Sequence, residues 1–256
     1  MQDIYTLLAP FYDALNGEID YAAWADFLEE DFKQYFPHGV REVLDLACGT
    51  GSMTLELARR GYDMVALDSS PEMLAVARAR AEETGLDRDV LYLCQDMCDF
   101  ELYGTVDAVV SCLDSINHIT DRTALRRVFS LVHNYLVPNG LFLFDINSPY
   151  KFSEIYGQRD YVLEADGVVC AWQNDFRSQS GLCDFYITLF SEETDGRYAR
   201  RDAHRRERCY SLLTLRRLLR ETGFELLSVV GDFAHGQIKD TTERYYITAR
   251  AVKEEV

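Results

Sequence analysis

The stretch VLDLACGTGSM, residues 43–53, joins a short apolar run and an acid to a series of small residues. The residues EVLDLA (42–47) predict a buried strand, because strands in parallel sheets are apolar on both faces. The residues GSMTLELARRG (51–61) predict a helix. Between the two, small side chains leave backbone N–H groups and the start of the helix open to an extended, polar ligand. The stretch therefore predicts a cofactor site at the end of a strand.

Strands and helices alternate after this stretch. Further strands are expected at residues 62–68, 89–96, 106–114, 141–147, 224–233 and 242–252, and further helices at residues 70–85, 121–137 and 211–223. Ser70, Pro71 and Gly85 are typical of a helix start and end. Such alternation predicts an α/β fold with a Rossmann-like, seven-stranded, mostly parallel sheet and helices on both faces.

Two segments fall outside this alternation. Residues 1–39 show two amphipathic helical patterns, the first interrupted by Pro10 and the second beginning after Asp20, and they predict N-terminal helices. Residues 149–209 show strand-like pieces without helices between them, which predict an antiparallel β meander. We expect a cofactor-binding domain of residues 1–148 and 210–256 and an inserted antiparallel subdomain of residues 149–209.

Charge and cysteine content restrict the partners and the compartment. The chain of 256 residues carries 43 acidic and 26 basic side chains, a net charge of -17, which disfavours nucleic acid and anionic membranes as partners. The arginine-rich segment 196–208 is either a solvated strand pair or an anion contact. Seven cysteines in a chain without a signal peptide indicate reduced thiols in the cytoplasm. Cys94 and Cys98 lack a matching Cys or His pair, so we expect no metal site.

The glycine stretch is compatible with some cofactor classes and not with others. A phosphate-binding P-loop needs a lysine and a hydroxyl residue after its second glycine, where this chain has Ser52 and Met53. A dinucleotide fingerprint needs a glycine or alanine at the position of Thr54. Gly49 and Gly51 still match its first half. A nicotinamide-dependent (NAD) oxidoreductase therefore remains an alternative.

The motif D-L-A-C-G-T-G resembles the first motif of the class I S-adenosylmethionine-dependent methyltransferases. The stretches SPEML, CQDM, SCLDSIN and GLFLFDIN are similar to one branch of that family, which contains amino-sugar N-methyltransferases and other small-molecule enzymes. The resemblance covers most of the chain. It implies S-adenosyl-L-methionine as the cofactor.

The resemblance also implies that residues 1–39 form a helical lid over the cofactor, and it implies a set of cofactor contacts. Asp68 would accept hydrogen bonds from both ribose hydroxyls, Asp96 would accept from the adenine amino group, and Met73 and Met97 would border the adenine. The full predicted set is Tyr12, Tyr21, Ala47, Cys48, Gly49, Thr50, Gly51, Asp68, Ser69, Met73, Asp96, Met97, Cys112 and Leu113. The successive strand ends at which these acids stand are where open parallel sheets bind ligands.

Methyl transfer is an in-line displacement at a sulfonium carbon, so most of its catalysis is positioning. A general base matters only where the nucleophile loses a proton. His118 is the candidate base, although it could instead cap or pack a helix, and Asn117 and Asp145 are predicted to contact the acceptor. The sequence thus predicts a methyltransferase that acts on nitrogen or oxygen of a small molecule, as a monomer or homodimer. A non-catalytic cofactor-binding module remains a second alternative.

Overall fold

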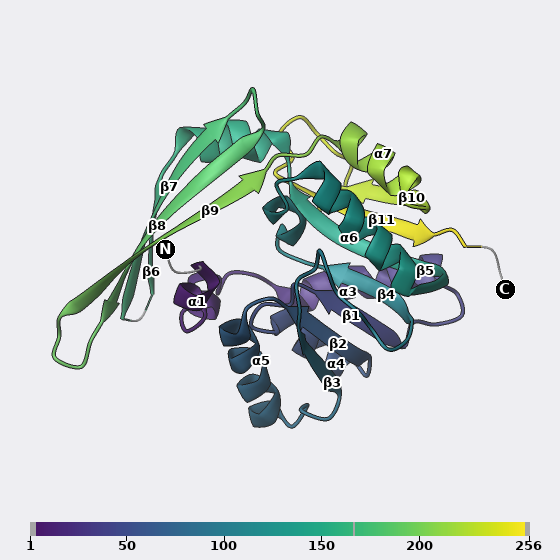
Figure 1. Cartoon of the computed structure of the whole chain (residues 1–256), viewed down its shortest axis with the longest axis horizontal. Coiled ribbons are helices and arrows are strands. Elements are labelled where there is room, and N and C mark those ends of the chain that lie inside the picture. Colours follow the sequence, from purple (N-terminus) through teal and green to yellow (C-terminus); the bar gives the residue numbers. More distant parts are fainter. Residues whose placement is uncertain (1–3, 166, 254–256) are drawn as a thin grey trace.

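The computed structural model of the chain describes residues 4–165 and 167–253. The strands of the larger sheet are β1 (Glu42–Leu46), β2 (Asp63–Asp68), β3 (Val90–Cys94), β4 (Val106–Ser111), β5 (Leu136–Asn147), β10 (Phe224–Val230) and β11 (Arg244–Ala251). The helices are α1 (Ile4–Leu8), α2 (Tyr12–Leu15), α3 (Tyr21–Tyr35), α4 (Ser52–Arg59), α5 (Pro71–Thr84), α6 (Arg122–Tyr135) and α7 (Leu212–Glu221). A second sheet lies to one side (Figure 1).

The larger sheet has seven strands in the order β10-β11-β5-β4-β1-β2-β3. Strand β1 pairs in parallel with β2 and β4, and β2–β3 and β4–β5 are also parallel. Only β11 runs antiparallel to its neighbours β5 and β10. The predicted mostly parallel sheet is confirmed. The strand order reverses between β1 and β4, and ligands of such sheets bind beside that point, at the carboxyl ends of the strands.

Successive residues of the central strands face opposite layers of helices. Val110 and Leu143 belong to the apolar cluster that includes α3 and α4, whereas Val109 and Phe142 belong to the cluster that includes α6 and α7. Both faces of the sheet are therefore covered, which is why its strands are apolar at consecutive positions.

The predicted helix caps are confirmed. The Asp20 carboxylate accepts a hydrogen bond of 2.9 Å from the backbone N–H of Ala23 at the start of α3. The Ser70 hydroxyl accepts one of 3.2 Å from Met73 at the start of α5, and Gly85 ends that helix in the left-handed conformation. These caps satisfy backbone groups that have no partner inside the helix.

The boundary between α6 and β5 differs from the prediction. Helix α6 ends at Tyr135, and β5 already begins at Leu136 and continues through Pro138. Proline cannot donate a ladder hydrogen bond, and the pairing of β4 with β5 shifts register between Val106 and Ala108, opposite this proline. Residues 138–140, which the predicted ranges leave between a helix and a strand, are thus an irregularity inside a strand.

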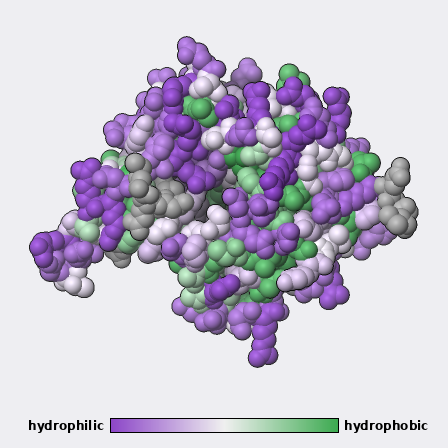
Figure 2. All heavy atoms as spheres, viewed as in Figure 1, coloured by the Kyte–Doolittle hydropathy of each residue, from purple (hydrophilic) through white to green (hydrophobic). Residues whose placement is uncertain are grey.

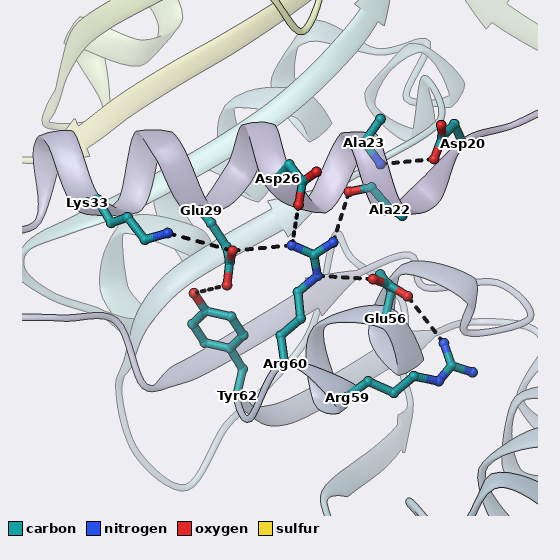
Figure 3. Close-up of polar contacts among 10 residues, drawn as sticks. All are labelled: Asp20, Ala22, Ala23, Asp26, Glu29, Lys33, Glu56, Arg59, Arg60 and Tyr62. Atoms are coloured by element: carbon teal, nitrogen blue, oxygen red, sulfur yellow. Dashed lines mark hydrogen bonds and ion pairs between the residues drawn. The ribbon is translucent and has the colours of Figure 1, made fainter.

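The N-terminal helices are attached to the domain at two places. Proline 10 separates α1 from α2, as the sequence predicts, and α1 places Leu7 in an apolar cluster of the smaller sheet. Helix α3 is held on the end of α4 by the Arg60 guanidinium, which donates to Asp26 at 2.6 Å, to the Ala22 carbonyl at 3.0 Å and to Glu56 at 3.0 Å (Figure 3). The segment before β1 is therefore anchored at both ends.

The smaller sheet consists of β6 (Tyr161–Ala165), β7 (Val168–Arg177), β8 (Leu182–Glu192) and β9 (Tyr198–Arg208), paired antiparallel in chain order. It follows short helical turns at Lys151–Ile155 and Tyr156–Gln158. The predicted antiparallel meander is confirmed, with residues 161–176 divided between two strands. This sheet projects from the larger one, and hydrophilic side chains cover its tip (Figures 1 and 2).

Candidate functional site

A cavity of about 380 Å³ lies at the carboxyl ends of β1 to β4. Its size is within the range of small-molecule sites. All of the predicted cofactor residues except Gly51 line it: Tyr12, Tyr21, Ala47, Cys48, Gly49, Thr50, Asp68, Ser69, Met73, Asp96, Met97, Cys112 and Leu113. The structure thus brings residues from five regions of the chain to one space.

The backbone around the glycine stretch has left-handed conformations at the places where the chain turns. Gly49 has a φ of 55° and the non-glycine residue Ala47 a φ of 65°. Gly51, with a φ of 77°, precedes α4, and a Cβ at this position would lie 3.0 Å from the Ala77 Cβ of α5. Gly51 is therefore required for the turn and for helix packing, and it lies behind the cavity wall. Left-handed residues outside glycine are strained and cluster at functional sites.

Asp68 joins the glycine stretch to the next strand. Its carboxylate accepts hydrogen bonds from the backbone N–H groups of Gly49 at 2.9 Å and of Ser70 at 2.8 Å. Burial raises the pKa of this carboxyl, and the two backbone donors oppose that rise. A carboxylate offers about four lone-pair sites, so Asp68 retains acceptor capacity toward the cavity. This capacity suits a pair of vicinal hydroxyls.

Thr54 occupies the place where a dinucleotide fold needs a small residue for close packing of helix and strand. The Thr54 side chain is fully buried and donates a hydrogen bond of 2.5 Å to Asp45 of β1. Burial raises the pKa of Asp45 to about 7. The space next to the strand is thus filled by a side-chain pair, which disfavours the nicotinamide alternative.

A polar network links the N-terminal helices to the glycine stretch. The Asp13 carboxylate of α2 accepts from the Thr50 hydroxyl at 2.7 Å, from the Ser52 hydroxyl at 3.2 Å and from Arg80 of α5 at 2.9 Å. The neighbouring residue Tyr12 lines the cavity. Asp13 therefore connects α2 to the glycine stretch and to α5.

His118 also lines the cavity, between helix α1 and strand β9 of the smaller sheet. Its Nε2 lies 2.7 Å from the Tyr5 hydroxyl, and its Nδ1 accepts a hydrogen bond of 3.0 Å from Nε of Arg205. The Nδ1 atom also lies 3.5 Å from the Glu207 carboxylate. Burial, together with the Arg205 charge, lowers the pKa of His118 to about 3. The ring is therefore neutral.

The two predicted acceptor contacts lie outside the lining of this cavity. Asn117 donates to the Arg208 carbonyl at 2.8 Å and accepts from the Asn147 backbone N–H at 2.9 Å. Asp145 accepts from the backbone N–H of Asp114 at 2.9 Å and pairs with the Arg244 guanidinium. Both side chains connect the ends of strands. Their contact with an acceptor stays a prediction.

Sequence reasoning missed Tyr5 and Arg205, which also line the cavity. The alternation in β9 contained the signal for Arg205, because alternate residues of a strand face opposite sides. Ala203 and Glu207 are buried on the same side as Arg205, whereas Arg206 reaches Asp184 on the other side at 2.7 Å. The side chains of the arginine-rich segment thus lie on both faces of β9.

Asp114, His118 and Glu207 place possible metal-ligand atoms within 4.8 Å of one another. Protein cations already engage two of the three, because Arg205 donates to His118 and Arg244 donates to Asp114 at 2.8 Å. A divalent ion would have to displace these guanidinium groups, so we assign no metal to the cluster.

Known proteins resemble this chain in sequence. A family model described as a methyltransferase domain matches residues 43–140, from β1 into β5. A candidate methyltransferase of Geobacillus sp. strain WCH70 is 30% identical over 246 residues, which span 96% of this chain and 99% of that protein.

Solved structures resemble it over nearly the whole fold. An S-adenosylmethionine-dependent methyltransferase from Clostridium acetobutylicum ATCC 824 superposes with a TM-score of 0.86 and 31% identity, over 98% of this chain and 100% of that one. CalS10 from Micromonospora echinaspora, an amino pentose methyltransferase solved with S-adenosylmethionine bound, has a TM-score of 0.72 and 19% identity over 92% of this chain and 93% of that one. At that identity the second likeness concerns the fold alone.

Proposed function

Because the chain belongs to the class I S-adenosylmethionine-dependent methyltransferases, we propose that it methylates a nitrogen or an oxygen of a small molecule. The observation that carries this proposal is the cavity at the carboxyl ends of β1 to β4. The predicted cofactor residues except Gly51 line it, and so do Tyr5, His118 and Arg205. An acceptor held between the two sets meets polar side chains from separate elements.

S-adenosyl-L-methionine, when bound, supplies an electrophilic methyl group on a sulfonium sulfur. On the chain's side, Asp68 would accept hydrogen bonds from the ribose hydroxyls, and Asp96 would accept from the adenine amino group. Met73 and Met97, both in the wall, would lie against the adenine. The bare backbone of Ala47 to Gly51 would permit the close approach that such a ligand requires.

The acceptor wall favours a small molecule. It is formed by side chains of α1, the turn Ser115–His118 and β9, so the smaller sheet closes the cavity on that side. Such a wall would exclude water and hold the nucleophile near the methyl group. His118 is the side chain we propose to accept a proton.

The arrangement of the chain supports three further parts of the proposal. Residues 1–39 would act as a lid and residues 149–209 as an inserted subdomain on the cofactor-binding domain. None of the helices in residues 4–165 and 167–253 is long and apolar enough to cross a membrane. All seven cysteines are free, which is consistent with a cytoplasmic enzyme.

The proposal is tested by transfer of a deuterated methyl group. Purified protein is incubated with methyl-deuterated cofactor and a panel of small amines, amino acids, amino sugars and hydroxylated compounds, and products are identified by mass spectrometry. We expect label in a small-molecule product, lost in the Asp68→Ala variant and kept in Asp63→Ala at the other, exposed end of β2. Label found only in protein or nucleic acid would contradict a small-molecule acceptor.

A further inference from the structure

The Nδ1 atom of His118 has two polar neighbours, a hydrogen-bond donor and a carboxylate oxygen. Nε of Arg205 donates a hydrogen bond to it at 3.0 Å, and a carboxylate oxygen of Glu207 lies 3.5 Å away. A neutral imidazole carries one N–H and one lone pair, so Nδ1 either accepts from the arginine or donates to the ionised form of Glu207. The two contacts therefore correspond to different tautomers of the ring. Burial raises the pKa of the Glu207 carboxyl, and the Arg205 charge opposes that rise.

With Arg205 in place, His118 does not act as a base. The guanidinium is always charged and only donates, so Nδ1 must accept and Nε2 must carry the ring proton. Nε2 is the nitrogen that faces Tyr5 and the cavity, 2.7 Å from the Tyr5 hydroxyl. In this tautomer no lone pair is directed at the cavity.

With Arg205 moved away, the Glu207 carboxylate is positioned to take its place. Glu207 is only 5% exposed, and among the described residues its Oε2 atom has no hydrogen-bond partner. A buried carboxylate without full hydrogen bonding is costly. A hydrogen bond from Nδ1–H to Oε1, the oxygen that lies 3.5 Å from Nδ1, would give Glu207 a donor and leave the Nε2 lone pair directed at Tyr5. The His118 ring would then be oriented as a proton acceptor.

The Arg205 side chain is suited to bind an anion. Its guanidinium lies over the Tyr5 ring, 5.0 Å from the ring centre, and lines the cavity. Within residues 4–165 and 167–253, Nε is the atom of this guanidinium that has a protein hydrogen-bond partner. The two terminal nitrogens are left for a ligand. Their fork matches the oxygens of a carboxylate or a phosphate.

We infer that the acceptor carries an anionic group, a carboxylate or a phosphate, that Arg205 binds, and that this binding transfers Nδ1 of His118 from Arg205 to Glu207. The inference rests on the proposed methyl transfer to a small molecule and specifies its substrate class. It couples recognition of the acceptor to the activation of the base. A neutral compound in the cavity leaves His118 in the unreactive tautomer.

Bonds and protons are accounted for in the resulting methyl transfer. The acceptor nitrogen or oxygen forms its bond to the methyl carbon, the carbon–sulfur bond breaks, and its electron pair stays on sulfur. The proton of the nucleophile passes to the Tyr5 oxygen while the Tyr5 hydroxyl proton passes to Nε2 of His118. The imidazolium formed is stabilised by Glu207. Arg205 is here a binding residue, and Glu207 is a positioning residue.

The anion site is tested without an acceptor. Inorganic phosphate and acetate are titrated separately by NMR into the complex of the protein with S-adenosylhomocysteine. We expect one or both to bind, with an affinity reduced about tenfold to a hundredfold in Arg205→Gln, because a hydrogen bond to a charged group is lost. Arg205→Lys keeps the charge but not the paired donors of the guanidinium. Its anion affinity should lie between those of the wild type and Arg205→Gln. Arg200→Gln, on an exposed side chain of the same strand, should bind as the wild type does.

Two outcomes would overturn the anion site. Equal affinities in the wild type and Arg205→Gln would show that the anion binds elsewhere. Weaker binding of S-adenosylhomocysteine to Arg205→Gln, together with no phosphate or acetate binding to the wild-type complex, would assign Arg205 to the cofactor's own carboxylate.

The tautomer exchange has its own spectroscopic readout. Nitrogen-15 NMR of His118, assigned with His118→Gln, should show Nε2–H in the cofactor-product complex and Nδ1–H once the bound anion is added. Glu207→Leu should abolish the change, and Glu207→Gln, which keeps an acceptor oxygen, should restore part of it. An unchanged tautomer in the wild type at saturating anion would overturn the exchange.

Matched acceptors separate this inference from the proposed function. Pairs that differ in the anionic group alone are compared, such as β-alanine with propylamine and phosphoethanolamine with ethanolamine. We expect release of S-adenosylhomocysteine with at least one anionic member and not with its neutral partner. Turnover of neutral members only would contradict the inference and keep the proposed function. Anion binding through Arg205 without methylation of any small molecule would contradict the proposed function and keep the anion site.

Discussion

The Thr54 hydroxyl donates a hydrogen bond of 2.5 Å to the Asp45 carboxyl, and both side chains are buried beneath the cofactor loop. The pair joins the first strand to the helix that follows the glycine stretch. It also holds an ionisable group in the interior, where the charged form is disfavoured. The neighbouring Asp68 adds to this effect.

The buried Asp45 should make stability depend on pH. Its pKa is raised from 3.8 to about 7, so between these values the folded chain binds a proton that the unfolded chain has lost. Stability should therefore fall as pH rises through this window. Asp45→Asn removes this dependence and should be more stable than the wild type by up to about 4 kcal/mol near pH 8, an upper limit set by the size of the shift.

Urea unfolding at about pH 5 and about pH 8 measures the difference. Asp63→Asn, at the exposed start of β2, is the control and should show no such change. An Asp45→Asn variant whose stability relative to the wild type is the same at both pH values would contradict the assignment.

Asp68→Ala should weaken binding of the cofactor by about 1–3 kcal/mol, through loss of hydrogen bonds to the ribose hydroxyls. The variant also loses the hydrogen bonds from the Gly49 and Ser70 backbone that order the loop. Part of the loss of affinity therefore comes from a less ordered loop. Asp68→Asn keeps one acceptor oxygen, and its affinity for the cofactor should lie between those of the wild type and Asp68→Ala. Calorimetric titration with S-adenosylhomocysteine measures each affinity, and unchanged affinity would remove Asp68 from the site.

Asp13→Ala should weaken the attachment of α2 to the glycine stretch. The carboxylate connects α2 to Thr50, Ser52 and Arg80, and its removal leaves these groups without their shared partner. We expect faster release of the cofactor and faster amide hydrogen exchange in residues 4–15. A double-mutant cycle with Arg80→Ala should give a coupling of about 0.5–3 kcal/mol in cofactor binding. Additive effects would show that the two residues act separately.

The features that sequence reasoning predicted well are local ones. A helix cap such as Ser70 needs only its own turn, and the strand, glycine turn and helix around Gly49 form one continuous unit. Asp68 was found because it ends the next strand, and parallel strands end at the same edge. Such relations depend on spacing along the chain.

The features that were missed depend on contacts between distant segments. Arg205 reaches the cavity because β9 pairs with β8 in a register that places Arg205 opposite Phe185, and a shift of one residue would direct Arg206 inward instead. Tyr5 meets His118 through a helix that packs on that same sheet. Neither register nor docking is encoded in a short motif. The presence of Tyr5 and Arg205 in the cavity wall could therefore be seen only in the structure, whereas that of Asp68 was expected from the sequence.

The last prediction concerns His118. Its surroundings are Tyr5 from α1, Arg205 and Glu207 from β9, and Asp114, and burial with the Arg205 charge holds its pKa at about 3. The kcat/KM of the wild type, which reports the free enzyme with Arg205 on His118, should therefore show no acid limb near 6.5, the usual value of a histidine. His118→Gln should lower turnover by about a hundredfold or more and leave cofactor affinity unchanged, because a proton acceptor is lost.

The same residue gives a stability effect of the opposite sign to that of Asp45. The folded pKa of His118 lies below its unfolded value of 6.5, so the unfolded chain takes up the proton first and stability falls as pH decreases from 6.5 toward 3. His118→Gln should remove this loss, just as Asp45→Asn removes the loss on raising pH. The two dependences oppose each other in the wild type, so only the differences between each variant and the wild type reveal them. An acid limb near 6.5 in the kcat/KM of the wild type that disappears in His118→Gln would show that the imidazole titrates normally in the free enzyme and that Arg205 does not hold it neutral.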